Sequence, residues 1–165
     1  MLKISGLSKT YNGNKKAVDN MNLEVLNGDI FQIDKSERES LIKKYADIFD
    51  ITKNLGDLIS SYSHGMKQKL VIVSALIHKP RLLILDEPFV GLDPKASHLL
   101  KEIMKDLCKK GCAIFFSTRV LEVAEKLCNK VAIIKDGKLV VSGETKKVMG
   151  DSSLENVFME LFKNE

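Results

Sequence analysis

Apolar and polar residues alternate along the first part of the chain, over residues 2–7 and again over residues 21–26. A period of two predicts strands with one buried face. The dipeptide Asn27-Gly28 follows, which is typical of a two-residue hairpin turn, and the apolar residues around Ile30 would continue the sheet. We therefore predict antiparallel strands in an N-terminal β portion, residues 1–33.

From residue 34 onward the apolar residues recur with a helical period. They include Leu41, Ile42, Tyr45, Ile48 and Phe49, which share one helical face. A second helix is predicted from Ser63, whose hydroxyl can cap it, to about His78, where Lys79-Pro80 ends it. Residues 34–80 are therefore predicted to form a helical portion.

Short apolar strands then alternate with amphipathic helices. Leu82–Leu85 and Ala113–Phe116 are apolar at every position, which favours strands buried on both faces of a parallel sheet. Between them, Asp93 and Pro94 are typical of the first residues of a helix. Alternating helices and strands predict an α/β fold with a mainly parallel sheet.

The end of the chain continues this pattern. Asp136-Gly137 predicts a hairpin turn, which closes an α/β portion over residues 81–150. Residues 151–165 hold a final amphipathic helix, predicted at Ser153–Leu161. The 165 residues are expected to form a single domain, residues 1–165, built from these four portions.

Composition narrows the class of protein. With 44% hydrophobic and 29% charged residues, the chain is expected to be globular, neither disordered nor a fibrous rod. Its apolar runs are shorter than the roughly 20 residues that cross a bilayer, and the residues after Met1 lead us to expect no secretion signal. The formal charge is only +4, and arginine occurs three times, at distant positions. We therefore expect no nucleic-acid partner.

Polar residues follow both apolar strands of the predicted α/β portion. Asp86-Glu87 comes after the first strand and Ser117-Thr118-Arg119 after the second. Ligands of parallel sheets bind beyond the carboxyl ends of the strands. There Asp86 could hold a hydrated Mg²⁺ and Glu87 could polarise an attacking water. A helix cap or a solvated turn would also explain the two carboxylates.

Three segments carry a resemblance to a known family. Ser61–Leu70, Leu82–Pro88 and Gly91–Pro94 resemble, in order and spacing, the ATP-binding cassette (ABC) ATPases. The resemblance implies an ABC-type P-loop NTPase fold with a RecA-like core, here truncated. It also implies the signature motif at Tyr62–Gln68, the Walker B strand at Leu82–Asp86 with Glu87 as catalytic carboxylate, and the D-loop at Gly91–Pro94 with Asp93.

The signature segment also has a physical interpretation. Ser63 offers a hydroxyl and Gly65 permits close backbone approach at a helix N-terminus, which favours a phosphate. By the resemblance, that phosphate belongs to ATP held by the opposite subunit of a head-to-tail dimer. His64 stands where the family usually has glycine, a variation associated with bacterial drug and antibiotic exporter cassettes. Its contribution could be a backbone N–H alone.

The resemblance extends to both ends of the chain. Tyr11 stands where the family stacks an aromatic ring on adenine, although a turn tyrosine that packs on the sheet would look the same. Ser153–Leu161 resembles the short final helix of exporter cassettes. The implied cofactors are ATP and Mg²⁺, the latter held through water by Asp86.

The phosphate-binding loop of the family is missing. The motif G-x-x-x-x-G-K-[ST] does not occur, and the one Gly-Lys pair, Gly137-Lys138, lies in the predicted hairpin. The loop is expected after Phe31, where Gln32-Ile33 leads directly into a helix. The resemblance thus implies an internal deletion of the Walker A and Q-loop segment. By the same resemblance, Arg119 stands at the position of the switch histidine, where it could contact phosphate but cannot exchange a proton. A solvated arginine at a helix start would look the same.

These observations predict an ATP-binding subunit of an exporter-type ABC transporter that is inactive alone. The family couples ATP binding and hydrolysis to transmembrane transport. The implied partners are another ABC ATP-binding subunit, in a homodimer or heterodimer, and an integral-membrane permease subunit. The expected location is the cytoplasmic face of the plasma membrane. Two alternatives remain: a regulatory pseudo-cassette that donates its signature motif to an intact cassette, and a decayed deletion product.

Overall fold

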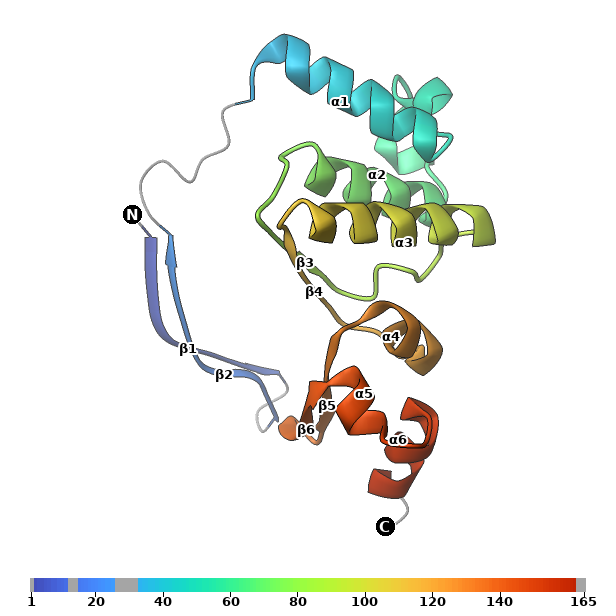
Figure 1. Cartoon of the computed structure of the whole chain (residues 1–165). Helices are drawn as coiled ribbons and strands as arrows, with labels where there is room; N and C mark the ends of the chain where they lie inside the picture. The colour runs from blue at the N-terminus through green and yellow to red at the C-terminus, as the bar shows by residue number, and fades with distance from the viewer. Residues whose placement is uncertain (1, 12–14, 26–32, 163–165) are drawn as a thin grey trace. The chain divides into compact units, whose positions relative to one another are not determined.

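The computed structural model describes residues 2–11, 15–25 and 33–162, with side chains from residue 33 to residue 161 (Figure 1). Contacts between residues divide the chain into two compact units. One unit is Ile33–Cys128, and the other combines Met1–Gln32 with Asn129–Glu165.

The N-terminal segment forms an antiparallel pair of strands. β1 (Leu2–Tyr11) pairs with β2 (Lys15–Val25), with Leu2 opposite Val25 and Tyr11 opposite Lys15. Three register shifts interrupt the ladder between those ends. The predicted antiparallel strands are therefore confirmed. The predicted turn at Asn27-Gly28 and the strand around Ile30 lie outside the described residues.

The C-terminal segment begins with the predicted hairpin. β5 (Lys130–Lys135) pairs antiparallel with β6 (Lys138–Glu144). The turn residues Asp136 and Gly137 have φ of 50° and 75°, and positive φ at both positions is the requirement of a type I′ turn. Two helices follow, α5 (Thr145–Met149) and α6 (Leu154–Phe162).

Three of the helices in unit Ile33–Cys128 start at residues whose side chains cap them. Asp34 precedes α1 (Lys35–Ile48) and accepts the Ser36 N–H at 3.0 Å. Ser63 precedes α2 (His64–Leu76) and accepts the Met66 N–H at 3.3 Å. Asp93 precedes α3 (Pro94–Lys109) and accepts the Ala96 N–H at 2.8 Å. Local capping thus fixes each start, as predicted for Ser63 and Asp93.

Shorter elements connect these helices. Two 3₁₀ turns, η1 (Thr52–Asn54) and η2 (Ile59–Ser61), lie between α1 and α2. The helix α4 (Leu121–Leu127) closes the unit.

The parallel part of the fold consists of β3 (Leu82–Leu85) and β4 (Ala113–Phe116). Leu82 pairs with Ala113 and Leu85 with Phe116, without a register shift. Because the strands run in the same direction, Asp86 and Ser117 follow them at one edge. The crossover between them is α3, so the unit has the predicted α/β organisation (Figure 1).

One hydrophobic core joins α1, α2, α3 and β3. Its buried members are Tyr45, Ala46, Phe49, Ile51, Ile72, Val73, Leu76, Leu83, Ala96, Leu100, Met104 and Cys112. Phe89 and Phe116 border this core and meet edge to face, with ring centroids 5.8 Å apart. The core therefore anchors the strand ends that carry the polar residues.

The prediction that both strands are buried on both faces is wrong. Leu83 is buried, but Leu82, Ile84 and Phe115 are 57%, 66% and 62% exposed. Successive side chains of a strand point to opposite faces. The core therefore covers the face that holds Leu83, and within the unit Ile33–Cys128 no layer covers the opposite face of the β3–β4 pair.

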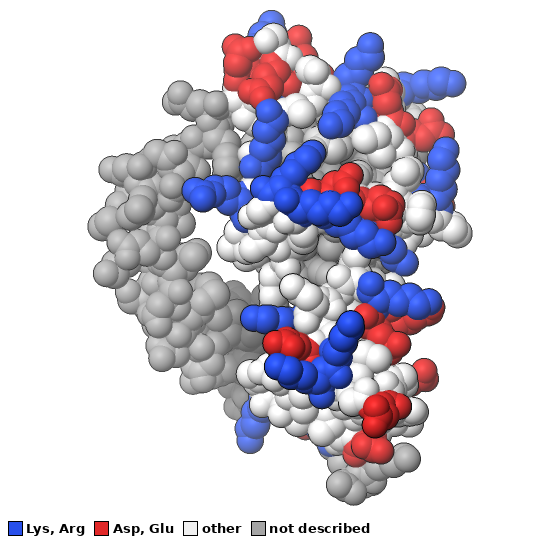
Figure 2. All heavy atoms as spheres, in the orientation of Figure 1, with Lys and Arg blue, Asp and Glu red and all other residues white. Residues whose placement is uncertain are grey.

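Charged side chains of both signs mix over the face drawn in Figure 2. Several form exposed ion pairs within one helix, such as Lys105 with Glu102 at 2.9 Å. Such pairs contribute little to stability. Within the part of the chain that the structure describes, every helix is too short or too polar to span a bilayer.

Candidate functional site

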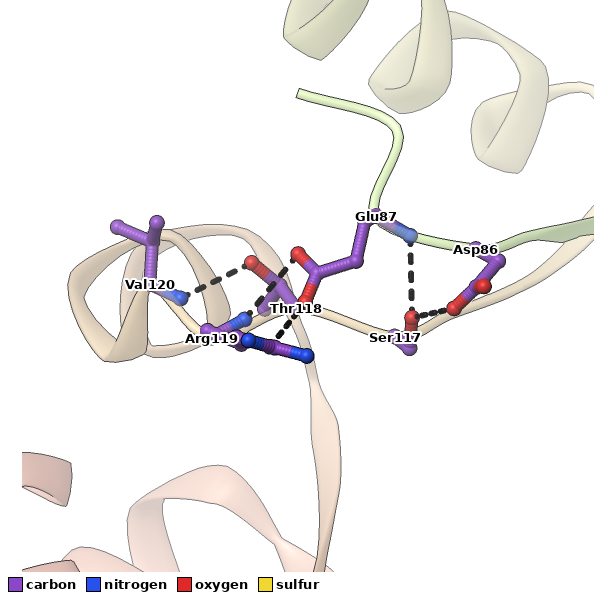
Figure 3. A network of polar contacts seen from close by, with 6 residues as sticks. All are labelled: Asp86, Glu87, Ser117, Thr118, Arg119 and Val120. Atoms are coloured by element: carbon purple, nitrogen blue, oxygen red, sulfur yellow. Dashed lines mark hydrogen bonds and ion pairs between the residues drawn. The ribbon is translucent and has the colours of Figure 1, made fainter. Parts of the chain in front are cut away.

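The polar residues that follow β3 and β4 meet in one network (Figure 3). The Ser117 hydroxyl donates a hydrogen bond to Oδ1 of Asp86 and accepts the backbone N–H of Glu87 at 3.0 Å. The backbone N–H of Ser117 donates to the Leu85 carbonyl at 3.0 Å. Ser117 therefore ties the end of β4 to the two carboxylate residues that follow β3. No role for Ser117 was predicted from its place after the second apolar strand.

Arg119 contacts the carboxylate of Glu87 from the β4 side. Its Nε lies 3.1 Å from Oε1, and its backbone N–H donates to Oε2 at 3.4 Å. The Glu87 side chain is 27% exposed, whereas that of Arg119 is 94% exposed. The guanidinium is permanently charged, so it places a fixed positive charge beside the predicted catalytic carboxylate.

Glu87 has an unusual backbone conformation. Its φ is 45°, in the left-handed region that non-glycine residues rarely adopt. Its carbonyl accepts the Val90 N–H at 3.1 Å, which closes a tight turn directly after the strand. The turn directs the chain from Glu87 towards the loop at Gly91 and Asp93.

That loop packs against the N-terminus of α2. A methyl group on Gly65 would lie 2.6 Å from the carbonyl oxygen of Gly91, closer than packed atoms approach. Gly91 itself has φ of 79°, and a methyl group there would lie 2.5 Å from Cδ2 of His64. Both glycines are therefore required by close packing within this chain.

Side chains of α2 hold the same loop on either side of Gly91. The Gln68 amide donates to the Pro88 carbonyl at 3.3 Å, and Nζ of Lys69 lies 2.8 Å from Oδ2 of Asp93. The hydrogen bond from Lys69 lowers the pKa of the Asp93 carboxyl below its usual range. Gln68 lay within the predicted motif without a role of its own, and Lys69 lay just beyond it. Their spacing from His64 and Gly65, about one helical turn, was the available signal.

The structure thus brings the predicted residues together in two groups. Ser63, Gly65 and Asp93 lie where α2 meets the loop, while Asp86, Glu87 and Arg119 lie at the strand ends. Residues 87–93 connect the two groups. Tyr11 ends β1, and its predicted stacking on adenine lies outside the described side chains.

The strand-end carboxylates suit a hydrated Mg²⁺ better than a caged metal. Among the described residues, no group of three or more His, Cys, Asp or Glu side chains could hold a metal ion. Mg²⁺ commonly keeps several waters and takes one or two carboxylates together with substrate phosphates. Asp86 is exposed, and its orientation is set by Ser117. Asp86 therefore fits a water-mediated Mg²⁺ ligand.

Known proteins are similar to this chain in sequence and in fold. A profile of the family described as ABC transporter matches residues 5–90. The uncharacterized ABC transporter ATP-binding protein YhaQ of Bacillus subtilis is 38% identical over 125 residues, which cover 76% of this chain and 42% of that protein. The Nod factor export ATP-binding protein I of Rhizobium leguminosarum bv. viciae is 33% identical over 132 residues, with the same coverages.

A solved structure agrees with these relatives. The ATP binding subunit of an ABC transporter superposes with a TM-score of 0.74 at 33% identity, over 79% of this chain and 56% of that chain. The present chain spans less than half the length of the two curated relatives. Sequence and fold together assign the chain to the ABC transporter family, among its ATP-binding proteins.

Proposed function

We propose that this chain is an ATP-binding subunit of an exporter-type ABC transporter that does not turn over ATP alone and completes the nucleotide site of an intact ABC ATP-binding subunit. The observation that carries the proposal is the close packing of α2 on the loop at Gly91, in a chain without the motif G-x-x-x-x-G-K-[ST]. The N-terminus of α2, which would bind a partner's nucleotide, is held in place by this packing. The phosphate-binding loop, which would bind the chain's own nucleotide, does not occur in the sequence.

The proposal of inactivity follows from how phosphates are held. A phosphate loop provides successive backbone N–H groups and one lysine, which together neutralise the β and γ phosphates. Without that loop, Asp86 could still hold Mg²⁺ through water, but the nucleotide would lack its main anchor. An internal deletion after Phe31 would account for the missing segment. The two units would then be portions of one incomplete domain.

At the strand ends, the contacts of Asp86 and Glu87 favour an arrangement in which ATP is not hydrolysed. Mg²⁺, when bound with ATP, would supply charge neutralisation at the phosphates. Ser117 orients Asp86 for this role, while Glu87 contacts Arg119. The side chain and the backbone N–H of Arg119 contact both oxygens of the Glu87 carboxylate. Arg119 would thus hold the carboxylate in a position where it does not orient a water.

At the N-terminus of α2, the chain would meet the partner's ATP. Ser63 is exposed, and its Oγ already accepts the Met66 N–H at 3.3 Å, so its hydroxyl proton is directed away from that contact. A phosphate oxygen could accept that proton, and the helix N-terminus would favour its negative charge. The Ser63 hydroxyl and the backbone N–H at Gly65 would donate hydrogen bonds to the phosphate, and neither would give up its proton.

The transport context is also a proposal. An exporter role is supported by the Nod factor export relative and by the resemblance of α6 to the final helix of exporter cassettes. The partners would be a second ABC ATP-binding subunit, identical or different, and an integral-membrane permease. The permease would hold the complex at the cytoplasmic face of the plasma membrane.

A mixing experiment tests the proposal. The steady ATPase rate of an intact ABC ATP-binding subunit is measured with and without this chain. We expect the chain to change that rate, the Ser63→Ala variant to lose the change, and the matched Ser74→Ala variant to retain it. Ser74 is an exposed serine of the same helix whose hydroxyl donates to the Val71 carbonyl at 2.8 Å. An unchanged rate with the wild-type chain would contradict the proposal.

A second candidate, a deletion product that folds incompletely, is favoured by the exposed Leu82, Ile84 and Phe115 on the β3–β4 pair. Open apolar sheet faces normally require a covering layer. A cooperative thermal transition, together with a native-like near-ultraviolet circular dichroism spectrum, would exclude this candidate. A gradual transition would support it.

A further inference from the structure

The imidazole of His64 occupies the space beside Gly91. A methyl group on Gly91 would lie 2.5 Å from Cδ2 and 2.9 Å from Nε2 of that ring. Real side-chain carbons do not approach other atoms this closely, so the ring fills the volume that a side chain at position 91 would need. His64 is the first residue of α2, next to the capping Ser63. The contact therefore joins the start of α2 to the tip of the loop.

Gly65 meets the same peptide unit. The position of a methyl group on Gly65 lies 2.6 Å from the Gly91 carbonyl oxygen. Gly91 is thus fixed by two consecutive residues, by the ring of His64 and by the backbone of Gly65. One turn further along α2, Gln68 and Lys69 hold the loop at Pro88 and Asp93. Of these contacts, those of His64 and Gly65 alone act directly at Gly91.

We propose that His64 is a positioning residue whose ring holds the Gly91 loop against Gly65 and thereby sets the conformation of Ser63 at the N-terminus of α2. The packing part of this proposal concerns this chain alone. Its consequence for a partner's nucleotide rests on the proposed function. The competing interpretation gives His64 only a backbone N–H, which any residue except proline would supply.

The two interpretations differ in what the side chain must be. A positioning ring is lost in His64→Ala and restored by His64→Phe, which returns a flat ring without the imidazole nitrogens. A backbone role is retained in both variants. His98→Ala is the matched control, because His98 is an exposed histidine on α3. None of these substitutions changes the Ser63 hydroxyl.

Nuclear magnetic resonance of the purified chain tests the packing. One α proton of Gly91 points at the ring, so ring currents should separate the two α-proton shifts of Gly91. We expect the separation to collapse in His64→Ala, to return in His64→Phe and to persist in His98→Ala. A separation that His64→Ala leaves unchanged would overturn the proposal.

A double-mutant cycle provides a second test of the packing. In Gly91→Ala, the alanine is strained by the positive φ in both backgrounds, so the free-energy cost of this backbone strain cancels in the double-mutant cycle. The clash with the ring does not cancel. We expect Gly91→Ala to lower the unfolding midpoint more in the wild-type chain than in His64→Ala. Equal losses in the two backgrounds would contradict the proposal.

The consequence for the partner is measured with the intact ABC ATP-binding subunit and MgATP. His64→Ala should reduce the change in ATPase rate by about tenfold, and His64→Phe should restore it. If the wild-type chain changes the rate and His64→Ala does so equally, the positioning role fails. If the wild-type chain has no effect while the Gly91 resonances respond to His64, the proposed function fails and the packing role stands.

Discussion

Arg119 contacts Glu87 through both its side chain and its backbone. Nε lies 3.1 Å from Oε1, and the backbone N–H donates to Oε2 at 3.4 Å. The carboxylate expected to activate water in an ABC ATPase is therefore held by a cation from the neighbouring strand end. Under the proposed function, Arg119 stands where a histidine that can exchange a proton is expected, and its guanidinium remains charged.

Removal of this contact should change stability little. The Arg119 side chain is almost fully exposed, and exposed ion pairs contribute about 0.2–1 kcal/mol. We expect Arg119→Ala to lower the free energy of unfolding by less than about 1 kcal/mol, and Arg119→Lys by less still. Urea denaturation at low and high salt measures both. A loss above about 2 kcal/mol would mean that the pair is shielded from water.

Ser117 should contribute more to the stability of the fold than its exposed position suggests. Ser117→Ala removes the donor to Asp86 and the acceptor of the Glu87 N–H, and each such hydrogen bond contributes about 1 kcal/mol. We therefore expect a loss of about 1–2 kcal/mol in the free energy of unfolding. Ser117→Thr retains the hydroxyl and should lose less. Equal losses in the two variants would contradict a role for the hydroxyl.

Asp93 combines two contacts that substitutions can separate. Asp93→Ala removes both the cap of α3 and the pair with Lys69, whereas Asp93→Asn retains a capping oxygen. We expect Asp93→Ala to cost about 1 kcal/mol more than Asp93→Asn in urea denaturation at neutral pH. An equal cost would show that Asp93 does not cap α3.

The pair of Asp93 with Lys69 should also make stability depend on pH. The hydrogen bond from Lys69 lowers the pKa of Asp93 in the folded chain below its unfolded value of about 4. The stabilisation is therefore present above pH 4 and is lost as the pH falls through the lower folded pKa. The stability difference between the wild-type chain and Asp93→Asn should shrink on acidification. A constant difference would contradict this assignment.

The helix starts could be predicted from sequence because their causes are local. Ser63 and Asp93 each accept a backbone N–H three residues later, so a few neighbouring residues fix the boundary. The hairpin at Asp136-Gly137 is equally local, since its positive φ values depend on the turn residues themselves.

Burial and long-range packing could not be predicted in this way. The apolar run at Leu82–Leu85 indicated a strand but overestimated its burial, because burial depends on which layers cover the sheet. Likewise, the close approach of Gly65 to the Gly91 carbonyl joins residues that are 26 positions apart in sequence, so no local pattern indicated it. The position of the ring of His64 beside Gly91 also depends on this packing.

The two faces of β3 provide a direct test of the corrected burial. Leu83 is buried and Ile84 is 66% exposed. Leu83→Ala should lower the free energy of unfolding by about 2–5 kcal/mol, because it leaves a cavity in the core. Ile84→Ala removes a comparable side chain from the open face and should cost less than about 1 kcal/mol. Similar losses in urea denaturation would mean that a further layer covers Ile84 in solution.

The most direct test of whether the chain lacks a nucleotide-binding site of its own is the binding of labelled MgATP to the purified wild-type chain, measured by equilibrium dialysis. Concentrations up to about 1 mM cover the range in which most enzymes bind their substrates. We predict no saturable binding over that range. Saturable binding of one ATP per chain would contradict the proposal that the nucleotide-gripping segment is missing.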